Sequence, residues 1–254
     1  MTWTETVSAS FRARHDSAAA DDAHRVLQSL ERARVYLEAF FPRAPEEFTV
    51  VLHGGAGGLT LTNPLLPLAW LAAAPAARRY VVGWDGRREL HMLEPSVLRE
   101  RASSVPGSQE MLEHSAACLY ARRVIIANNR DLAPLMPVLR IRRELRWAWL
   151  LEGAARWFGG QTDHARPAIA RRLREGGQPS FPPGLRDATL LGGTVIDLLV
   201  RDSDPPGPRA AARLASRLHP DGPRAALAQA FRGRPLVQIE SAWRAHLARV
   251  AAAQ

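Results

Sequence analysis

The period of the apolar residues changes near Ser96, and this change constrains the fold more than any other feature of the sequence. Before it, short runs rich in β-branched and aromatic residues are typical of strands. The predicted strands are residues 8–14, 47–53, 79–84 and 88–93, the last two forming a hairpin across Asp85-Gly86. Between the first two strands, residues 21–41 repeat apolar side chains with the period of a helix.

After Ser96 the helical period dominates, with breaks at glycine and proline clusters. Helices are predicted over residues 108–127, 138–160, 164–175, 189–201, 208–218, 222–231 and 236–252. The sequence therefore predicts an α+β fold: an N-terminal mixed β-sheet with a packed helix, followed by a mostly α-helical C-terminal half. We expect two closely packed parts, an α+β subdomain over 1–105 and a helical subdomain over 106–254.

The composition is that of a globular chain able to bury a core, with 254 residues of which 46% are hydrophobic and 23% charged. Cys118 is the sole cysteine, so no intramolecular disulfide can form. The longest apolar stretch, residues 65–77, contains two prolines and is shorter than the roughly 20 residues that span a bilayer. Because the first residues carry no signal-peptide pattern, we expect a cytoplasmic protein without a membrane span.

The chain is basic, with a net charge of +9, and all 34 basic residues are arginine. Such a charge allows a polyanion-binding function, which would show affinity that falls steeply with salt. The arginines are scattered, however, and the densest group, Arg140, Arg142, Arg143 and Arg146, has the spacing of a solvated helix face. The sequence therefore does not favour nucleic acid as the partner, and Arg-rich polyanion binding is kept as an alternative.

Two segments of the helical half carry residues typical of zinc chemistry. Glu110, His114 and Cys118 are four residues apart, so one helix would project them from one face. Further on, Trp149-Leu150-Leu151-Glu152-Gly153 continues to Phe158 in the pattern W-L-x-E-G-x-A-x-x-F. Together with the order of sheet, helix, connector and Glu-Gly helix, these segments resemble the gluzincin (peptidase MA-like) zinc peptidases.

The resemblance implies a thermolysin-like fold and assigns roles to four positions. His114 matches the first histidine ligand of the HExxH motif, Ser115 its general-base glutamate and Cys118 its second histidine, while Glu152 matches the third ligand. Two of these four positions have changed. A serine cannot accept a proton from metal-bound water near neutral pH, and general-base help typically contributes about 10²–10⁴ in rate. The degenerate motif therefore predicts a pseudoenzyme that binds a peptide or protein partner in a former active-site cleft.

Other interpretations of the same residues remain open. No cofactor is expected, but Zn bound by His114, Cys118 and Glu152 would give a divergent hydrolase with Glu110 or Glu113 as base. The inverted motif H-x-x-E-H is matched only in part, since Glu110 stands where its first histidine belongs. A nucleophilic Cys118 with His114 as base is a further alternative, although neighbours on one helix seldom reach in-line geometry.

Non-catalytic roles explain these residues as well. His114 could be hydrogen-bonded within its helix and Cys118 a small buried thiol, because free cysteines are among the most buried residues. Glu152 could pair with Arg122, Arg123 or Arg156. The aromatic residues of this region are expected to belong to the core rather than to a binding groove; they are Trp147, Trp149, Trp157 and Phe158.

Overall fold

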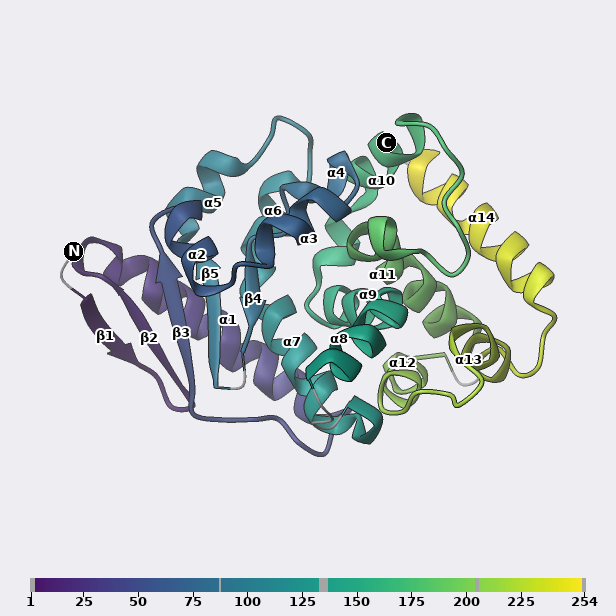
Figure 1. Cartoon of the computed structure of the whole chain (residues 1–254), viewed down its shortest axis with the longest axis horizontal. Helices are drawn as coiled ribbons and strands as arrows, with labels where there is room; N and C mark the ends of the chain where they lie inside the picture. The colour runs from purple at the N-terminus through teal and green to yellow at the C-terminus, as the bar shows by residue number, and fades with distance from the viewer. Residues whose placement is uncertain (1–2, 87, 133–136, 204–205, 253–254) are drawn as a thin grey trace.

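A computed structural model describes residues 3–86, 88–132, 137–203 and 206–252, and it confirms the α+β fold. The strands gather at the N-terminal end of the molecule and the helices fill the other end (Figure 1). The five described strands are β1 (Trp3–Val7), β2 (Phe11–Asp16), β3 (Phe48–His53), β4 (Gly83–Asp85) and β5 (Glu89–Leu93). They form one mixed sheet in the order β1-β2-β3-β5-β4.

The sheet has a parallel centre and antiparallel edges. Strands β2, β3 and β5 are parallel, whereas β1 pairs antiparallel with β2 and β4 antiparallel with β5. The predicted hairpin is thus confirmed as β4 and β5, while the first predicted strand is shifted to Phe11–Asp16. Strand β1 was not predicted, because Trp3–Val7 is almost wholly exposed and shows no alternation of buried and exposed residues.

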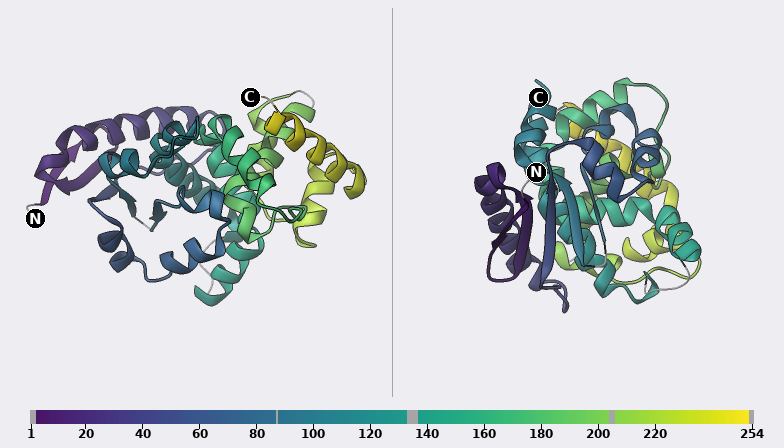
Figure 2. Two further views of the ribbon diagram at one scale, coloured as in Figure 1. Left: turned by 90° about the horizontal axis from the view of Figure 1, so that it is seen from above. Right: turned by 60° about the vertical axis from the view of Figure 1, so that its left-hand side comes forward.

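Helices cover both faces of the sheet (Figure 2). On one face lie α1 (Ala20–Glu38), the predicted amphipathic helix, and α7 (Ser115–Asn128), whose Leu119 packs on Gly83. On the other face lies α2 (Ala56–Thr62), in a segment predicted mainly as loop, where Gly58 packs on His53. The same segment contains α3 (Leu66–Ala72) and α4 (Pro75–Arg78). Helix α5 (Pro95–Arg101) lies on the α1 side instead, where Ser96 N–H donates to Asp22 Oδ2.

The C-terminal half is mostly helical, as predicted, but two predicted helices are each divided in two. The break in 108–127 falls at His114, between α6 (Ser108–Glu113) and α7. The break in 138–160 falls at Trp147, whose φ of −108° and ψ of 17° separate α8 (Pro137–Arg146) from α9 (Ala148–Phe158). The remaining α-helices are α10 (Arg166–Arg174), α11 (Leu185–Asp202), α12 (Pro208–Ala215), α13 (Pro223–Ala230) and α14 (Leu236–Ala252). Three short 3₁₀ helices complete the described elements: η1 (Ser17–Ala19), η2 (Arg130–Leu132) and η3 (Gln161–His164).

The closest helix pair in the core is α9 with α11, and two glycines allow it. A Cβ added to Gly153 would overlap the main chain of Gly192, and one added to Gly192 would lie 2.5 Å from the Trp149 carbonyl oxygen. Buried apolar residues from both halves of the chain form one continuous cluster. The division at residue 105 stays a prediction.

Among the described residues, no helix combines the length and the apolar character needed to cross a membrane. The cytoplasmic location stays a prediction.

Candidate functional site

A cavity of about 540 Å³ lies at the outer edge of the sheet, beside β4. Its walls are contributed by α3, α7, α8, α9 and the start of α11, so it is enclosed where the sheet meets the helical half. The size falls within the range of about 300–1,000 Å³ that is typical of ligand sites. Ser115, Cys118 and Glu152 line it, and the segments that carry the zinc-peptidase resemblance therefore meet at this cavity.

The mouth of the cavity is apolar and exposed. Leu68 of α3 is 60% exposed and Leu145 of α8 is 51% exposed, and both line the cavity. Leu65, Ile141 and Leu185 are also exposed lining residues. A row of exposed large apolar side chains at the mouth of a hollow is a feature of interaction sites, since it leaves apolar area in water until a ligand covers it.

The inner wall is polar and centred on Arg122 of α7. Its guanidinium binds three carboxylates: Nη1 contacts Asp85 Oδ1, Nη2 lies 2.8 Å from Glu144 Oε2, and Nε lies 3.1 Å from Glu152 Oε1. Two further arginines complete the cluster, with Arg140 Nε 2.6 Å from Glu144 Oε1 and Arg156 Nη2 3.6 Å from Glu152 Oε2. Three arginines thus balance three carboxylates.

The charged groups of this cluster shift one another's pKa values. Burial alone would lower the pKa of Arg122, but the attraction of the three carboxylates outweighs burial and raises it. Burial would likewise raise the pKa of Glu144, and its pairing with Arg122 and Arg140 lowers it instead. For Asp85 burial prevails over the attraction of Arg122 and raises the pKa, and repulsion from Glu144 and Glu152 adds to the rise. Arg122 therefore stays a cation, and Asp85 is the carboxylate that is hardest to keep charged.

Three buried polar atoms of residues that line the cavity have no hydrogen-bond partner among the described residues. They are Asp85 Oδ2, Ser115 Oγ and Arg156 Nε. The Asp85 side chain is only 4% exposed. Buried polar groups are nearly always paired, so unpaired atoms in a cavity wall mark the positions where a ligand or solvent would bond.

Strand β4 offers main-chain groups to the same cavity. Leu93 N–H donates to the Val82 carbonyl and Gly86 N–H to the Glu89 carbonyl, on either side of the pair Trp84 and His91. Because hydrogen-bonded residues alternate in an antiparallel pair, the main-chain groups of Gly83 and Asp85 point away from β5. In the described part of the chain β4 is the last strand on this side of the sheet, so these groups form a free edge that borders the cavity.

Of the predicted zinc ligands on the first segment, His114 lies outside the cavity lining and Cys118 lies in it. His114 Nδ1 donates a hydrogen bond to the Gly159 carbonyl at 2.8 Å, and the ring stacks on His164 with centroids 5.2 Å apart. Burial and then His164 lower the pKa of His114. Cys118 is buried against Gly159, and burial raises the pKa of its thiol to about 12. His114 and Cys118 thus have the environments of a hydrogen-bonded histidine and an inert thiol.

The third predicted ligand, Glu152, pairs with Arg122 and Arg156, two of the three arginines proposed for it from the sequence. Within the described residues, no group of three or more His, Cys, Asp and Glu side chains could hold a metal ion. Glu110 and Glu113, the alternative bases, are exposed on α6. Zinc binding by His114, Cys118 and Glu152 stays a prediction.

The aromatic residues of α9 and its flanks belong mainly to the core, as expected. Trp147, Trp149 and Phe158 are buried, and Trp157 is partly buried against the core. The sequence missed Asp85, which looked only like a turn residue, and Glu144, which lies within the basic stretch of α8. The spacing of Arg140 and Glu144, four residues apart, was the one local signal that a carboxylate of this stretch is paired.

Comparisons of the chain with family models, with curated proteins and with solved structures found no match.

Proposed function

We propose that the chain is a non-catalytic, peptidase-like protein that binds an extended peptide along β4. The observation that carries the proposal is the free edge of β4 beside an apolar cavity whose wall contains unpaired buried polar atoms. An exposed sheet edge binds peptides by adding a strand, because main-chain hydrogen bonds supply affinity and alternate side chains enter pockets.

The cavity supports a particular mode of binding. The main chain of the peptide would bond to Gly83 and Asp85, and one apolar side chain would enter between Leu68 and Leu145. A donor of the peptide would bond to Asp85 Oδ2, which has no partner in the part of the chain that the structure describes. Each of these contacts uses a group that the fold leaves unsatisfied, so binding costs no internal interaction.

The proposal does not include hydrolysis. Ser115 occupies the position that the resemblance assigns to the general base. Its Oγ has no hydrogen-bond partner among the described residues, so no neighbouring base activates it there. With its pKa raised to about 12, Cys118 is protonated near neutral pH, so it is a poor nucleophile. Glu152 is held by two arginines. The gluzincin resemblance supports the scaffold and the position of the cleft, and these substituted residues support its use for binding alone.

An array of short, capped peptides with different central residues tests the proposal. We expect peptides with a large apolar central residue to bind the full chain, as measured by fluorescence anisotropy. Leu68→Glu places a charge at the mouth and should weaken binding at least tenfold. The matched control is Leu61→Glu on α2, because Leu61 is 88% exposed and lies outside the cavity lining.

Two results would overturn the proposal. One is equal binding by the Leu68→Glu and Leu61→Glu variants, which would place the peptide elsewhere. The other is an array on which no peptide binds. Cleavage of a bound peptide, detected by mass spectrometry, would contradict the absence of catalysis while leaving the binding site in place.

A further inference from the structure

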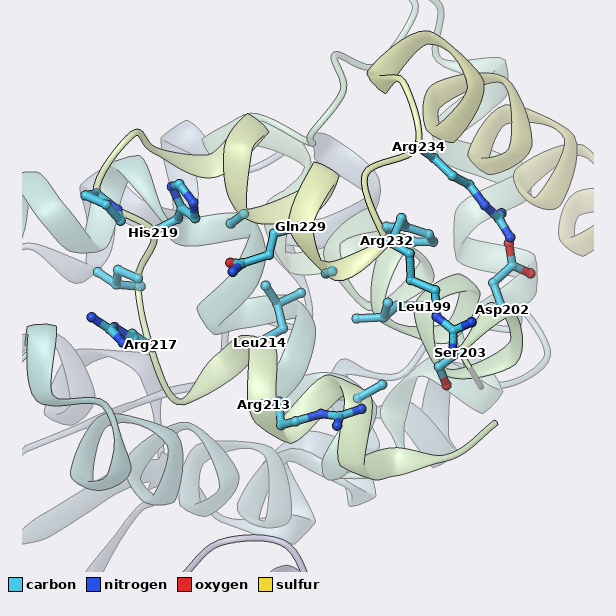
Figure 3. Close-up of a pocket in the computed structure, with 16 residues that line it drawn as sticks. Leu199, Asp202, Ser203, Arg213, Leu214, Arg217, His219, Gln229, Arg232 and Arg234 are labelled. Atoms are coloured by element: carbon cyan, nitrogen blue, oxygen red, sulfur yellow. The ribbon is translucent and has the colours of Figure 1, made fainter. Parts of the chain in front are cut away.

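A second hollow, of about 590 Å³, lies among the last helices of the chain and is separate from the cavity beside β4. It is bounded by the end of α11, by α12 and α13, and by the segments that follow α12 and α13 (Figure 3). We call it the arginine hollow, after its polar lining of Arg213, Arg217, Arg232, Arg234, His219 and Gln229.

The lining of the arginine hollow has an excess of positive charge. Among the described residues, four arginines and one acidic residue, Asp202, line it, a net charge of +3 with His219 counted as neutral. Arg234 Nη1 lies 2.9 Å from Asp202 Oδ2, so that acid is already paired. In the part of the chain that the structure describes, Arg213 and Arg217 form no ion pair. An anion would therefore meet guanidinium groups that the fold has not neutralised.

The arginines come from separate segments and surround one space. Arg213 belongs to α12, Arg217 follows it, and Arg232 and Arg234 follow α13. Figure 3 shows Gln229 near the centre, Arg217 and His219 at one end, and Arg232 beside Ser203 at the other. A ligand in the hollow would thus meet positive groups from several directions.

Arg232 also has an unusual backbone conformation. Its φ is 58°, in the left-handed region that favours glycine, and Gly233 follows with a φ of 74°. The turn is held by hydrogen bonds from Arg232 N–H to the Gln229 carbonyl and from Arg234 N–H to the Phe231 carbonyl. Glycine would adopt this backbone conformation with less strain. An arginine at this position is therefore explained if its side chain takes part in binding.

The floor of the hollow is apolar. Leu199, Leu214, Leu218 and Phe231 are buried side chains that line it. A bare inorganic anion would use the arginines only, whereas an organic anion would cover the floor as well. The combination of apolar floor, central amide and guanidinium groups matches a phosphorylated organic molecule.

We propose that the arginine hollow binds a small organic phosphate of the nucleotide class, with its phosphates on Arg213, Arg217 and Arg232 and its organic part on the apolar floor. Arginine suits this task because its planar guanidinium bonds two phosphate oxygens at once. The proposal does not rest on peptide binding beside β4, since the two sites share no lining residue.

Isothermal titration calorimetry of the full chain with ATP, ADP, adenosine and pyrophosphate tests this assignment. We expect ATP and ADP to bind more tightly than about 1 mM, adenosine not to bind, and pyrophosphate to bind more weakly than ADP. Arg213→Gln and Arg217→Gln should each weaken ATP binding by about tenfold or more. Arg209→Gln is the matched control, because Arg209 is exposed on the same helix as Arg213 and lies outside the lining.

Three outcomes would overturn the proposal. The first is the absence of binding by either nucleotide, and the second is an equal loss of ATP affinity in the Arg209→Gln and Arg213→Gln variants. The third is tight binding of single-stranded RNA while ATP fails to compete, which would make the arginines part of a nucleic-acid surface instead. Circular dichroism of each variant shows whether it is folded, so a lost affinity is not mistaken for unfolding.

Discussion

The two hollows of this protein use the same cationic residue in opposite ways. Beside β4, the guanidinium of Arg122 is 17% exposed and is surrounded by Asp85, Glu144 and Glu152. In the arginine hollow, four exposed arginines and Asp202 line the space, and Arg213 and Arg217 form no ion pair with the described residues. Beside β4 the arginine holds three segments of the chain together, whereas in the arginine hollow Arg213 and Arg217 are available to a ligand. The carboxylates around an arginine, more than the arginine itself, therefore indicate whether its role is structural.

Removal of the central arginine of the cavity should have the largest effect. In Arg122→Met, the buried carboxylate of Asp85 and the partly buried carboxylates of Glu144 and Glu152 lose their shared cation, and loss of one partner of a buried ion pair typically costs about 3–5 kcal/mol. The matched variant Arg213→Met removes an exposed arginine without an ion pair and should change the free energy of unfolding by less than about 0.5 kcal/mol. Urea unfolding monitored by circular dichroism measures both. Similar losses of unfolding free energy in the two variants would contradict the difference between the two hollows.

The wall that carries Glu152 should be nearly as sensitive. Gly153→Ala forces a methyl group into the main chain of α11, and overpacking of this kind costs about 1–3 kcal/mol. Gly57→Ala on α2 is the control, since a Cβ there meets nothing within 4 Å. An alanine is favoured over glycine in a helix, so Gly57→Ala should leave stability unchanged or raise it by up to about 1 kcal/mol. If both variants melt at the same temperature, α9 and α11 do not approach as closely as described.

The cluster also predicts that the stability of the fold depends on pH. Because the pKa of Glu144 is lowered in the folded state, its stabilising contribution is present above its ordinary pKa and is lost as the pH falls through the folded value. Glu144→Gln should therefore be about 1–2 kcal/mol less stable than the parent at pH 7, and the gap should close in acid. Asp202→Asn removes only an exposed ion pair, so at pH 7 it should change the free energy of unfolding by less than about 1 kcal/mol. A Glu144→Gln gap that widens in acid would contradict the sign of this shift.

The smallest expected effect concerns the zinc content of the purified chain. Since Glu152 is paired with arginines and Cys118 is a buried, protonated thiol, the purified chain should contain far less than one zinc ion, measured by plasma mass spectrometry. Stoichiometric zinc that disappears in a Cys118→Ser variant would revive the zinc hydrolase alternative. It would also show that the cavity can bind a cation beside Arg122.

Local periodicity predicted the architecture better than the site. The β-branched run around Val50 predicts a buried strand, and the helical repeat of Val26 and Leu30 predicts a helix with one buried face, so a single segment reveals each element. The breaks at His114 and Trp147 were missed, because the apolar residues on either side of each break keep the spacing of one continuous helix.

The site depends on contacts between distant segments. The partners of Glu152 were predicted, since Arg156 is one helical turn away and Arg122 lies on the helix to which the resemblance assigns the first ligands. Asp85 is 37 residues from Arg122, and no local pattern links them. The arginine hollow likewise forms from segments whose scattered arginines looked like a solvated surface.

Hydrogen–deuterium exchange of the full chain, with and without the array peptide that binds most tightly, tests the central claim about β4 most directly. We expect slower amide exchange at Gly83 and Asp85 when the peptide is present, because their outward amides would gain hydrogen-bond partners. Strand β1, the other edge of the sheet, serves as the internal control and should not change. Protection confined to β1 or to the segments around α12 and α13, with β4 unaffected, would contradict the account.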